Sequence, residues 1–203
     1  DHAGPDDLFI CVISGGSSAL MSCPIDGISL EDEIKVTDVM TKSGANIYEI
    51  NAIRRHISQM NGGMLAKRIE ARGAELIGFG ISDAVGNPAT GDIGIPYAKY
   101  KSTPMGPDAT TLDDARRVIR DYDVADRLPK NVAGPECETP KAFPNNTYYL
   151  LNTLPDSCIY AKQVAEEMGI PAVILTSFLE GESRDVGTMF ASIAREIQAY
   201  GNP

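Results

Sequence analysis

Four short apolar runs stand out along the chain, at residues 8–13, 75–81, 148–151 and 172–176. A run of this length, rich in branched and aromatic side chains, is typical of a strand buried on both faces of a parallel sheet. We therefore expect residues 9–13 and 76–81 to form central, buried strands. The other two runs would complete the sheet.

Between these runs, apolar positions recur at the spacing of amphipathic helices. The pattern predicts helices over residues 28–42, from Asn46 or Asn51 to residue 60, and over 64–72, 112–122, 156–168 and 183–200. Start signals support two of them, because Ser29 and Asp32 have the spacing of a capping box and Thr110-Thr111 precedes residue 112. Residues 87–108 and 126–146 show no periodicity, so we expect long irregular connections there.

Strands that alternate with helices predict an α/β fold, in which a mostly parallel sheet carries helices on both faces as a three-layer α/β/α domain. Ligands bind such sheets at the carboxyl ends of the strands. We therefore expect one functional rim, built from the polar groups that follow the four strands. These groups are segment 14–18, Ser82-Asp83, Asn152, and residues 176–182.

The first of these segments consists only of small residues: Ser14, Gly15, Gly16, Ser17 and Ser18. Backbone N–H groups with little side-chain bulk, at the start of a helix, form a site for a phosphate or another anion. The alternative is a tight strand–helix connection, with glycines for positive φ and serines as caps. The segment is neither a P-loop, which needs Gly-Lys-Ser or Gly-Lys-Thr, nor the GxGxxG dinucleotide motif.

Charged side chains supply the candidate chemistry. Asp83 follows an apolar strand, where a carboxylate can bind Mg²⁺, act as a base, or merely cap a turn. Arg54 and Arg55 suit recognition of carboxylate or phosphate, but neighbours on a helix differ by about 100°, so we expect only one of them to face the core. His56 fits a hydrogen-bonded structural residue better than a catalyst. Glu180 would approach a ligand after the last strand, or serve as a first-turn acid of the next helix.

Composition narrows the class of protein. The net charge of −10 argues against a nucleic-acid partner and against a polybasic membrane contact. No apolar run approaches the roughly 20 residues of a membrane span. The 4 cysteines lack metal-finger spacing and indicate free thiols in a reducing compartment, so we expect a cytoplasmic protein; with only 2 histidines, a multi-histidine metal site is not expected.

An ordered series of motifs resembles the glycerate 2-kinase family, whose members also carry a domain called MOFRL. Residues 13–20 are similar to its ISGGGSAL segment, and residues 43–58 follow its SGAxIxEINxVRKHxS pattern closely. Further matches lie at residues 82–86 (SDVVG in the family), 102–111 (SGPTxPDPTT), 138–141 (ETPK) and 179–182 (LxGEA). The series extends over nearly the whole chain, which makes it far more specific than any single motif.

The resemblance implies a Rossmann-like domain that transfers phosphate from ATP to the 2-hydroxyl of D-glycerate, giving 2-phosphoglycerate and ADP, with ATP and Mg²⁺ as cofactors. Relatives also carry the older name hydroxypyruvate reductase, so an NAD(P)H-dependent reductase is an alternative function. A non-catalytic ligand-binding fragment is the third possibility. Residues 1–178 would form most of the family's larger domain without its beginning, and 179–203 its end or a linker toward a missing MOFRL domain. We expect the fragment alone to be inactive, and a homodimer stays open.

Phosphoryl transfer needs donors around the phosphates, a cation, and an acid that holds Mg²⁺ or orients the hydroxyl. Segment 14–18 would bind the nucleotide, and Arg54 and Asp83 would be catalytic, with Asp83 also holding the metal ion. Arg54, Asn152 and Glu180 would contact the substrate.

The chain departs from the family pattern at a few positions. Ser17 replaces a glycine, and Asn61 replaces a lysine before Gly62-Gly63, so a positive charge is lost. The SGPT segment is eroded at Thr103, Met105 and Ala109, which leaves its role open.

Overall fold

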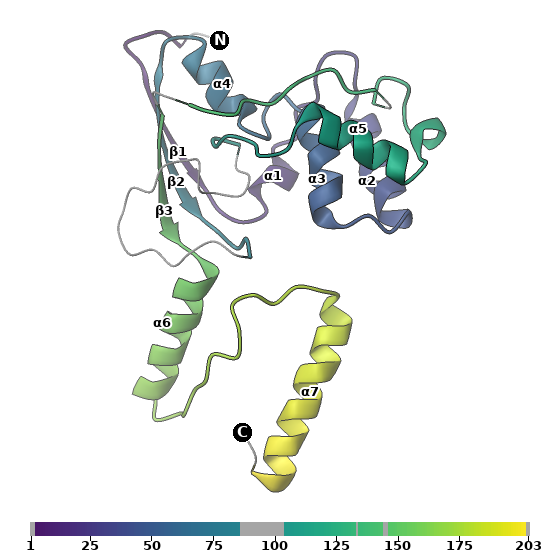
Figure 1. The fold of residues 1–203 in the computed structure, drawn as a ribbon. Helices are drawn as coiled ribbons and strands as arrows, with labels where there is room; N and C mark the ends of the chain where they lie inside the picture. Colours follow the sequence, from purple (N-terminus) through teal and green to yellow (C-terminus); the bar gives the residue numbers. More distant parts are fainter. Residues whose placement is uncertain (1–2, 86–103, 133, 144–145, 202–203) are drawn as a thin grey trace. The chain divides into compact units, whose positions relative to one another are not determined.

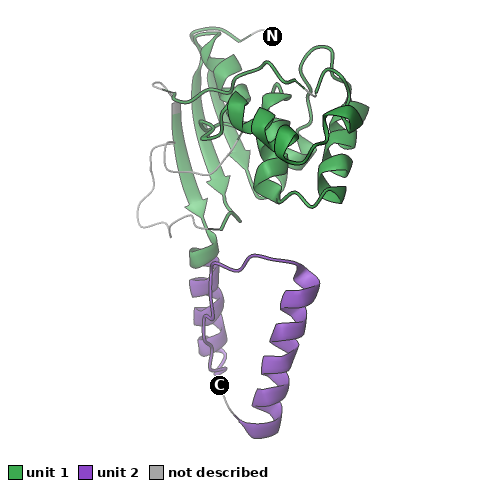
Figure 2. Ribbon diagram, turned by 45° about the vertical axis from the view of Figure 1, so that its right-hand side comes forward, with its two compact units in different colours: residues 1–156 green, residues 157–203 purple. Residues whose placement is uncertain are grey.

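The computed structural model of this chain of 203 residues describes residues 3–85, 104–132, 134–143 and 146–201 (Figure 1). The chain divides into two compact units, residues 1–156 and 157–203 (Figure 2). Helix α6 (Leu154–Glu167) crosses the boundary and α7 (Ser183–Tyr200) lies in unit 2. The other elements belong to unit 1: β1 (Leu8–Ile13), α1 (Ser17–Leu20), α2 (Leu30–Lys42), α3 (Ile47–His56), α4 (Met64–Glu70), β2 (Glu75–Ile81), α5 (Leu112–Asp121), the 3-10 turn η2 (Ala125–Arg127) and β3 (Asn146–Asn152).

The three strands form one parallel sheet in the order β1-β2-β3, so β2 is the central strand. Leu8 pairs with Glu75 and Ile13 with Gly80, so β1 and β2 run in register along their whole length. Parallel pairing points the carboxyl ends of all three strands to the same edge. The predicted α/β class and its parallel sheet are confirmed.

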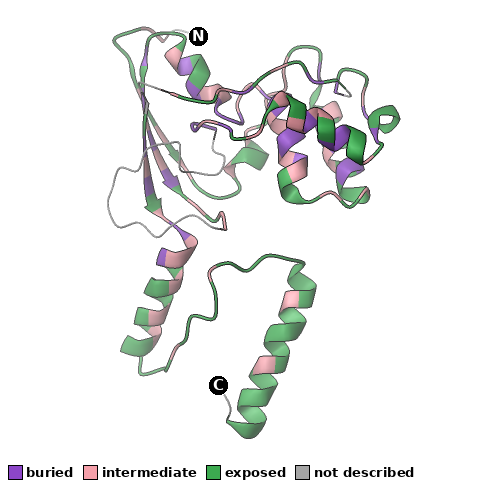
Figure 3. Ribbon diagram, in the orientation of Figure 1, coloured by how far each residue is buried: buried purple, intermediate pink, exposed green. Residues whose placement is uncertain are grey.

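The prediction that β1 is a central strand buried on both faces is wrong. Within the described residues β1 pairs only with β2 and forms an edge. Its side chains alternate, because Leu8, Ile10 and Val12 are 51%, 63% and 68% exposed (Figure 3), whereas the residues between them pack against the core. The run is apolar on both faces, yet in unit 1 only one face meets a helical layer.

Residues 172–176 are not a strand, which corrects a second expectation. The segment is irregular, and its Val173 side chain is 79% exposed. Strand propensity alone does not form a strand, because the backbone also needs a neighbour to take its hydrogen bonds. None of the described strands pairs with this segment.

The covered face of the sheet packs on α4. Ala66 and Ile69 of α4 lie against Leu76, Tyr148 and Leu150 of the sheet in one buried cluster, which also holds Met105. This packing holds one face of β2 and β3 against α4.

A second apolar core lies between α2, α3 and α5, where α3 packs against both other helices. Val36 and Met40 of α2, Ile53 of α3 and Ile119 of α5 are buried there. Each helix begins with a capping box, formed by Ser29 with Asp32, Asn46 with Glu49, and Thr111 with Asp114. The predicted caps of α2 and α5 are confirmed, and Asn46 is the residue that opens α3.

Two helices are shorter than the pattern predicts. The segment after the glycine-rich turn forms the single turn of α1, and α3 ends at His56. The connection from α3 to α4 then closes through Gly62 and Gly63, which have φ of 63° and 80°. A Cβ at Gly63 would lie 2.5 Å from the Gly106 carbonyl oxygen. This tight turn carries the buried Asn61.

Unit 2 contains most of α6, an irregular segment and α7. Helix α7 has the predicted bounds and no buried residue. Among the described helices, none combines the length and the apolar character needed to cross a bilayer.

Candidate active site

The carboxyl ends of the three strands meet at one edge of the sheet, as predicted. The Ser82 N–H donates to the Asn152 carbonyl oxygen at 2.8 Å, which joins the ends of β2 and β3. The loop after β1 lies beside the residues that follow β2, because a Cβ built on Gly15 would be 2.2 Å from Asp83 Oδ2. The structure therefore brings together three of the predicted groups: segment 14–18, Asp83 and Asn152.

The glycine-rich loop keeps its shape through its own hydrogen bonds. Ser17 Oγ donates to the Ser14 carbonyl and accepts from the Ser14 N–H, and Gly16 has a φ of 81°. Among the described residues, the N–H groups of Gly15 and Gly16 have no hydrogen-bond acceptor. Since α1 is a single turn, these two N–H groups, more than a helix dipole, are what the loop offers to an anion.

A pocket of ≈ 660 Å³ lies beside this loop in unit 1. Its volume falls within the range of about 300–1,000 Å³ that is usual for small-molecule sites. Its walls combine α1, α3, the segment that follows β2 and the segment that precedes α5. They are formed by Ser18, Ile47, Tyr48, Asn51, Arg55, Asp83, Ala84, Val85, Asp108, Ala109 and Thr110.

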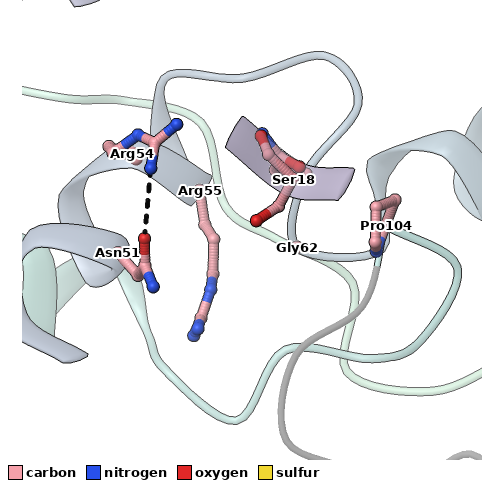
Figure 4. Close-up of a pocket in the computed structure, with 7 residues that line it drawn as sticks. Ser18, Asn51, Arg54, Arg55, Gly62 and Pro104 are labelled. Carbon is pink, nitrogen blue, oxygen red and sulfur yellow. Dashed lines mark hydrogen bonds between the residues drawn. The ribbon is translucent and has the colours of Figure 1, made fainter. Parts of the chain in front are cut away.

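A smaller cavity of ≈ 20 Å³ shares Ser18, Asn51 and Arg55 with this pocket (Figure 4). Its other walls are Arg54, Asn61, Gly62 and Pro104. That volume holds about one water-sized group. The predicted Arg54 thus lies in a cavity that adjoins the pocket containing Asp83.

Arg54 is mostly buried and already paired. Its Nη2 lies 3.5 Å from Glu33 Oε1 of α2. Its Nη1 donates to Asn51 Oδ1 at 3.4 Å (Figure 4). Both contacts are long, and Arg54 Nε and Glu33 Oε2 are buried without a partner among the described residues. Arg54 therefore keeps an unused donor at Nε.

Arg55 is equally buried, which corrects the expectation that only one of the two arginines faces the core. Its Nη1 donates to Asp108 Oδ1 at 2.9 Å, and the Asp108 side chain is 0% exposed. Asp108 also accepts from the Thr110 N–H and from the hydroxyls of Thr110 and Thr139. Both arginines are covered because α3 has neighbours on two sides: α2 beside Arg54, and segment 108–111 beside Arg55.

His56 is a structural residue, as expected. It is fully buried, and its Nδ1 lies 2.7 Å from the Ala52 carbonyl oxygen, which can only accept, so Nδ1 is the donor in this contact. Its Nε2 faces Glu138 Oε1 at 3.1 Å. This contact ties the end of α3 to the ETPK segment.

The Glu138 carboxylate accepts several hydrogen bonds at this point. Burial alone would raise the pKa of Glu138, but hydrogen bonds from Lys141, the Leu112 N–H, His56 and the Thr139 N–H outweigh it and lower the pKa to about 2. The carboxylate therefore stays ionised and fixes the start of α5, which directly follows one wall of the larger pocket.

Glu180 is not among the residues that form either pocket wall. It lies in unit 2, exposed, in the irregular segment before α7, whereas both pockets belong to unit 1. The predicted residues 102–103 and Gly86 fall outside the described residues.

Asp83 fits one carboxylate ligand of a magnesium site. It is exposed, lines the larger pocket, and lies beside a loop with N–H donors for phosphate. Among the described residues, no group of three or more histidine, cysteine or acidic side chains could hold a metal. Mg²⁺ is usually held in proteins by one or two carboxylates together with substrate phosphates and water.

Three residues of the site escaped the prediction from sequence. Glu33 could have been noticed, because it falls three residues before Val36 on the apolar face of α2. Asn61 donates from Nδ2 to the Ser18 carbonyl at 3.2 Å, whereas the sequence marked it only as the loss of a lysine before Gly62-Gly63. Asp108 lies in an aperiodic segment, where the pattern carries no signal for burial.

Comparison with known proteins agrees with this architecture. A family described as a domain of unknown function (DUF4147) matches residues 1–134. A glycerate 2-kinase of Pyrococcus horikoshii is 39% identical over 100% of this chain and 46% of its own length. A D-glycerate 2-kinase of Thermotoga maritima is 34% identical over 100% of this chain and 46% of its own.

A solved structure of glycerate kinase from Thermotoga maritima matches the fold with a TM-score of 0.69 at 33% identity, covering 100% of this chain and 46% of that one. The chain therefore belongs to the DUF4147 family. Its resemblance to the glycerate 2-kinases is confirmed over its full length, and it spans about half the length of those relatives.

Proposed function

We propose that the intact polypeptide transfers the terminal phosphoryl group of ATP to the 2-hydroxyl of D-glycerate, giving 2-phosphoglycerate and ADP. The observation that carries the proposal is the ≈ 660 Å³ pocket, which joins Ser18 at the end of the glycine-rich loop to Asp83 and the arginine-bearing helix α3. The similarity to glycerate 2-kinases over the whole chain supports it.

The groups in and around the pocket have separate roles in this reaction. The N–H groups of Gly15 and Gly16 would bind phosphate oxygens, and Arg54 on α3 would donate to the substrate from its unpartnered Nε. Asn152 lies at the same edge of the sheet and would contact the substrate. These groups would act by positioning the substrates and neutralising charge on the phosphates, because phosphoryl transfer needs little covalent chemistry from the protein.

Asp83 lies so close to the loop that it would repel a bound phosphate by like charge. A cation between them removes that repulsion, so Asp83 would hold Mg²⁺, which neutralises charge on the phosphates when it is bound. Its second oxygen is free to orient the attacking hydroxyl. Asp83 thereby fixes where phosphate and hydroxyl meet.

A coupled assay on the intact polypeptide tests the proposal against its alternatives. One arm supplies ATP, Mg²⁺ and D-glycerate and measures ADP formation. A second arm supplies NADH or NADPH with hydroxypyruvate and measures nicotinamide oxidation. ADP formation that depends on glycerate is the expected result. Nicotinamide oxidation instead, or activity in neither arm, would overturn it in favour of a reductase or a binding module.

A further inference from the structure

Asn61 is held in a rigid place next to the glycine-rich loop. It is 5% exposed, and its N–H donates to Ser58 Oγ at 3.0 Å. The positive-φ residues Gly62 and Gly63 follow it directly. Its Nδ2 donates to the Ser18 carbonyl at 3.2 Å, so the amide cannot turn freely.

The other end of this amide has no partner. Asn61 Oδ1 is buried and accepts no hydrogen bond from any described residue. Leaving such an acceptor unsatisfied costs about 1–3 kcal/mol, and a group of this kind calls for an explanation. Asn61 lines the ≈ 20 Å³ cavity together with Arg54, whose Nε is likewise buried and unpartnered.

Two of the residues that line the cavity therefore carry an unpartnered group, one an acceptor and one a donor. A hydroxyl group satisfies both, because it gives one proton and accepts another. An ionised carboxylate or phosphate has no proton for Asn61 Oδ1. Charge points the same way, since Arg54 faces Glu33 and Arg55 faces Asp108, so the two positive charges are already balanced.

Size decides which hydroxyl fits. The cavity takes about one water-sized group, so it has no room for a phosphoryl group beside the oxygen. The hydroxyl that receives phosphate must then lie in the larger pocket, near Asp83. The hydroxyl left for the cavity is the one that does not react.

We propose that this cavity is a specificity subsite for the non-reacting 3-hydroxyl of glycerate, with Asn61 Oδ1 as acceptor and Arg54 Nε as donor. The inference rests on the proposed function. A site built to bond a substrate hydroxyl discriminates strongly against an analogue that lacks it, because its own buried groups stay unpaired. D-lactate is that analogue: it keeps the carboxylate and the 2-hydroxyl and lacks only the 3-hydroxyl.

The test compares kcat/KM for D-glycerate and D-lactate in the intact polypeptide. The wild type should prefer glycerate by about 100-fold or more. Asn61→Leu, which keeps the shape and removes both polar atoms, should reduce this preference at least tenfold. Asn61→Asp keeps an acceptor oxygen but loses the donor to Ser18, so it should lower overall activity and keep the preference. Glu70→Gln is the matched control, because Glu70 Oε1 is also buried and unpartnered but lines neither cavity.

The outcomes separate this inference from the proposed function. A wild type that phosphorylates neither compound refutes the function itself. A wild type that turns over glycerate and lactate equally well refutes the subsite without any variant, even if Asn61→Leu fails to fold. An unchanged preference in folded Asn61→Leu also refutes it, and a water would then be the occupant of the cavity.

Discussion

Replacing Asp108 with asparagine is the sharpest test of how the pocket wall is held. The Asp108 side chain is 0% exposed and faces Arg55, whose side chain is only 12% exposed. Asparagine has nearly the same shape but carries no charge, and it presents an NH₂ group where a carboxylate oxygen accepted. Arg55 would then be a buried cation without a counter-charge.

The structure sets the size of the effect. Removing one partner of a buried ion pair costs about 3–5 kcal/mol. Asp108 also accepts from Thr110 and Thr139, and at least one of these donors would meet the new NH₂ group. We therefore expect Asp108→Asn to lower the free energy of unfolding by at least about 3 kcal/mol. With a urea m-value of about 2 kcal/mol/M, the unfolding midpoint should fall by about 1.5 M.

The assay is urea unfolding followed by circular dichroism, with Asp38→Asn as the control. Asp38 pairs with Lys42 at 2.8 Å, but the two side chains are 53% and 68% exposed. An exposed pair of this kind contributes about 0.3–0.5 kcal/mol, so the control should barely move. A loss below about 1 kcal/mol in Asp108→Asn would refute the reasoning, because it would mean that Arg55 does not depend on this carboxylate.

Two further predictions concern the loop and the ETPK segment. Gly15→Val should weaken ATP binding measured by calorimetry by about two orders of magnitude while the fold survives, because its side chain would occupy the position of the Asp83 carboxylate; Gly4→Val, with open space around it, is the control, and intact binding in folded Gly15→Val would show that the loop is only a turn. For Glu138, the folded pKa of about 2 lies below the ordinary value of 4.5, so its contribution to stability is present above pH 4.5 and is lost as the pH falls toward 2. Glu138→Gln should flatten the fall of the thermal midpoint over this range, and identical pH profiles for the two proteins would contradict the assignment.

The sequence predicts those features of the fold that depend on neighbouring residues better than those that depend on contacts between distant segments. The capping boxes at Ser29 and Thr111 are local signals, and the structure forms them. The placement of β1 is not local, because a wholly apolar strand looks the same at the centre and at the edge of a sheet. Residues 172–176 failed as a strand for a related reason: a strand is defined by its neighbour, and composition does not name the neighbour.

In the site, too, the residues at strand ends could be predicted and the long-range contacts could not. The end-of-strand rule places Asp83 beside segment 14–18, and the near-contact of Gly15 with Asp83 bears this out geometrically. The partners of Arg54 and Arg55 could not be predicted, because Glu33 and Asp108 lie far away in sequence and meet α3 only through packing. Helical periodicity describes one helix at a time and does not say how many neighbours surround it.

The most direct measurement of the central claim is the turnover of Asp83→Asn in the intact polypeptide with ATP, Mg²⁺ and D-glycerate. In the proposed reaction Asp83 lies where phosphate and hydroxyl meet, so turnover should fall by roughly two to three orders of magnitude. The unfolding midpoint should stay nearly unchanged, because the Asp83 side chain is exposed. Normal turnover, or a loss of activity that comes only from unfolding, would show that Asp83 caps a turn and that the chemistry takes place elsewhere.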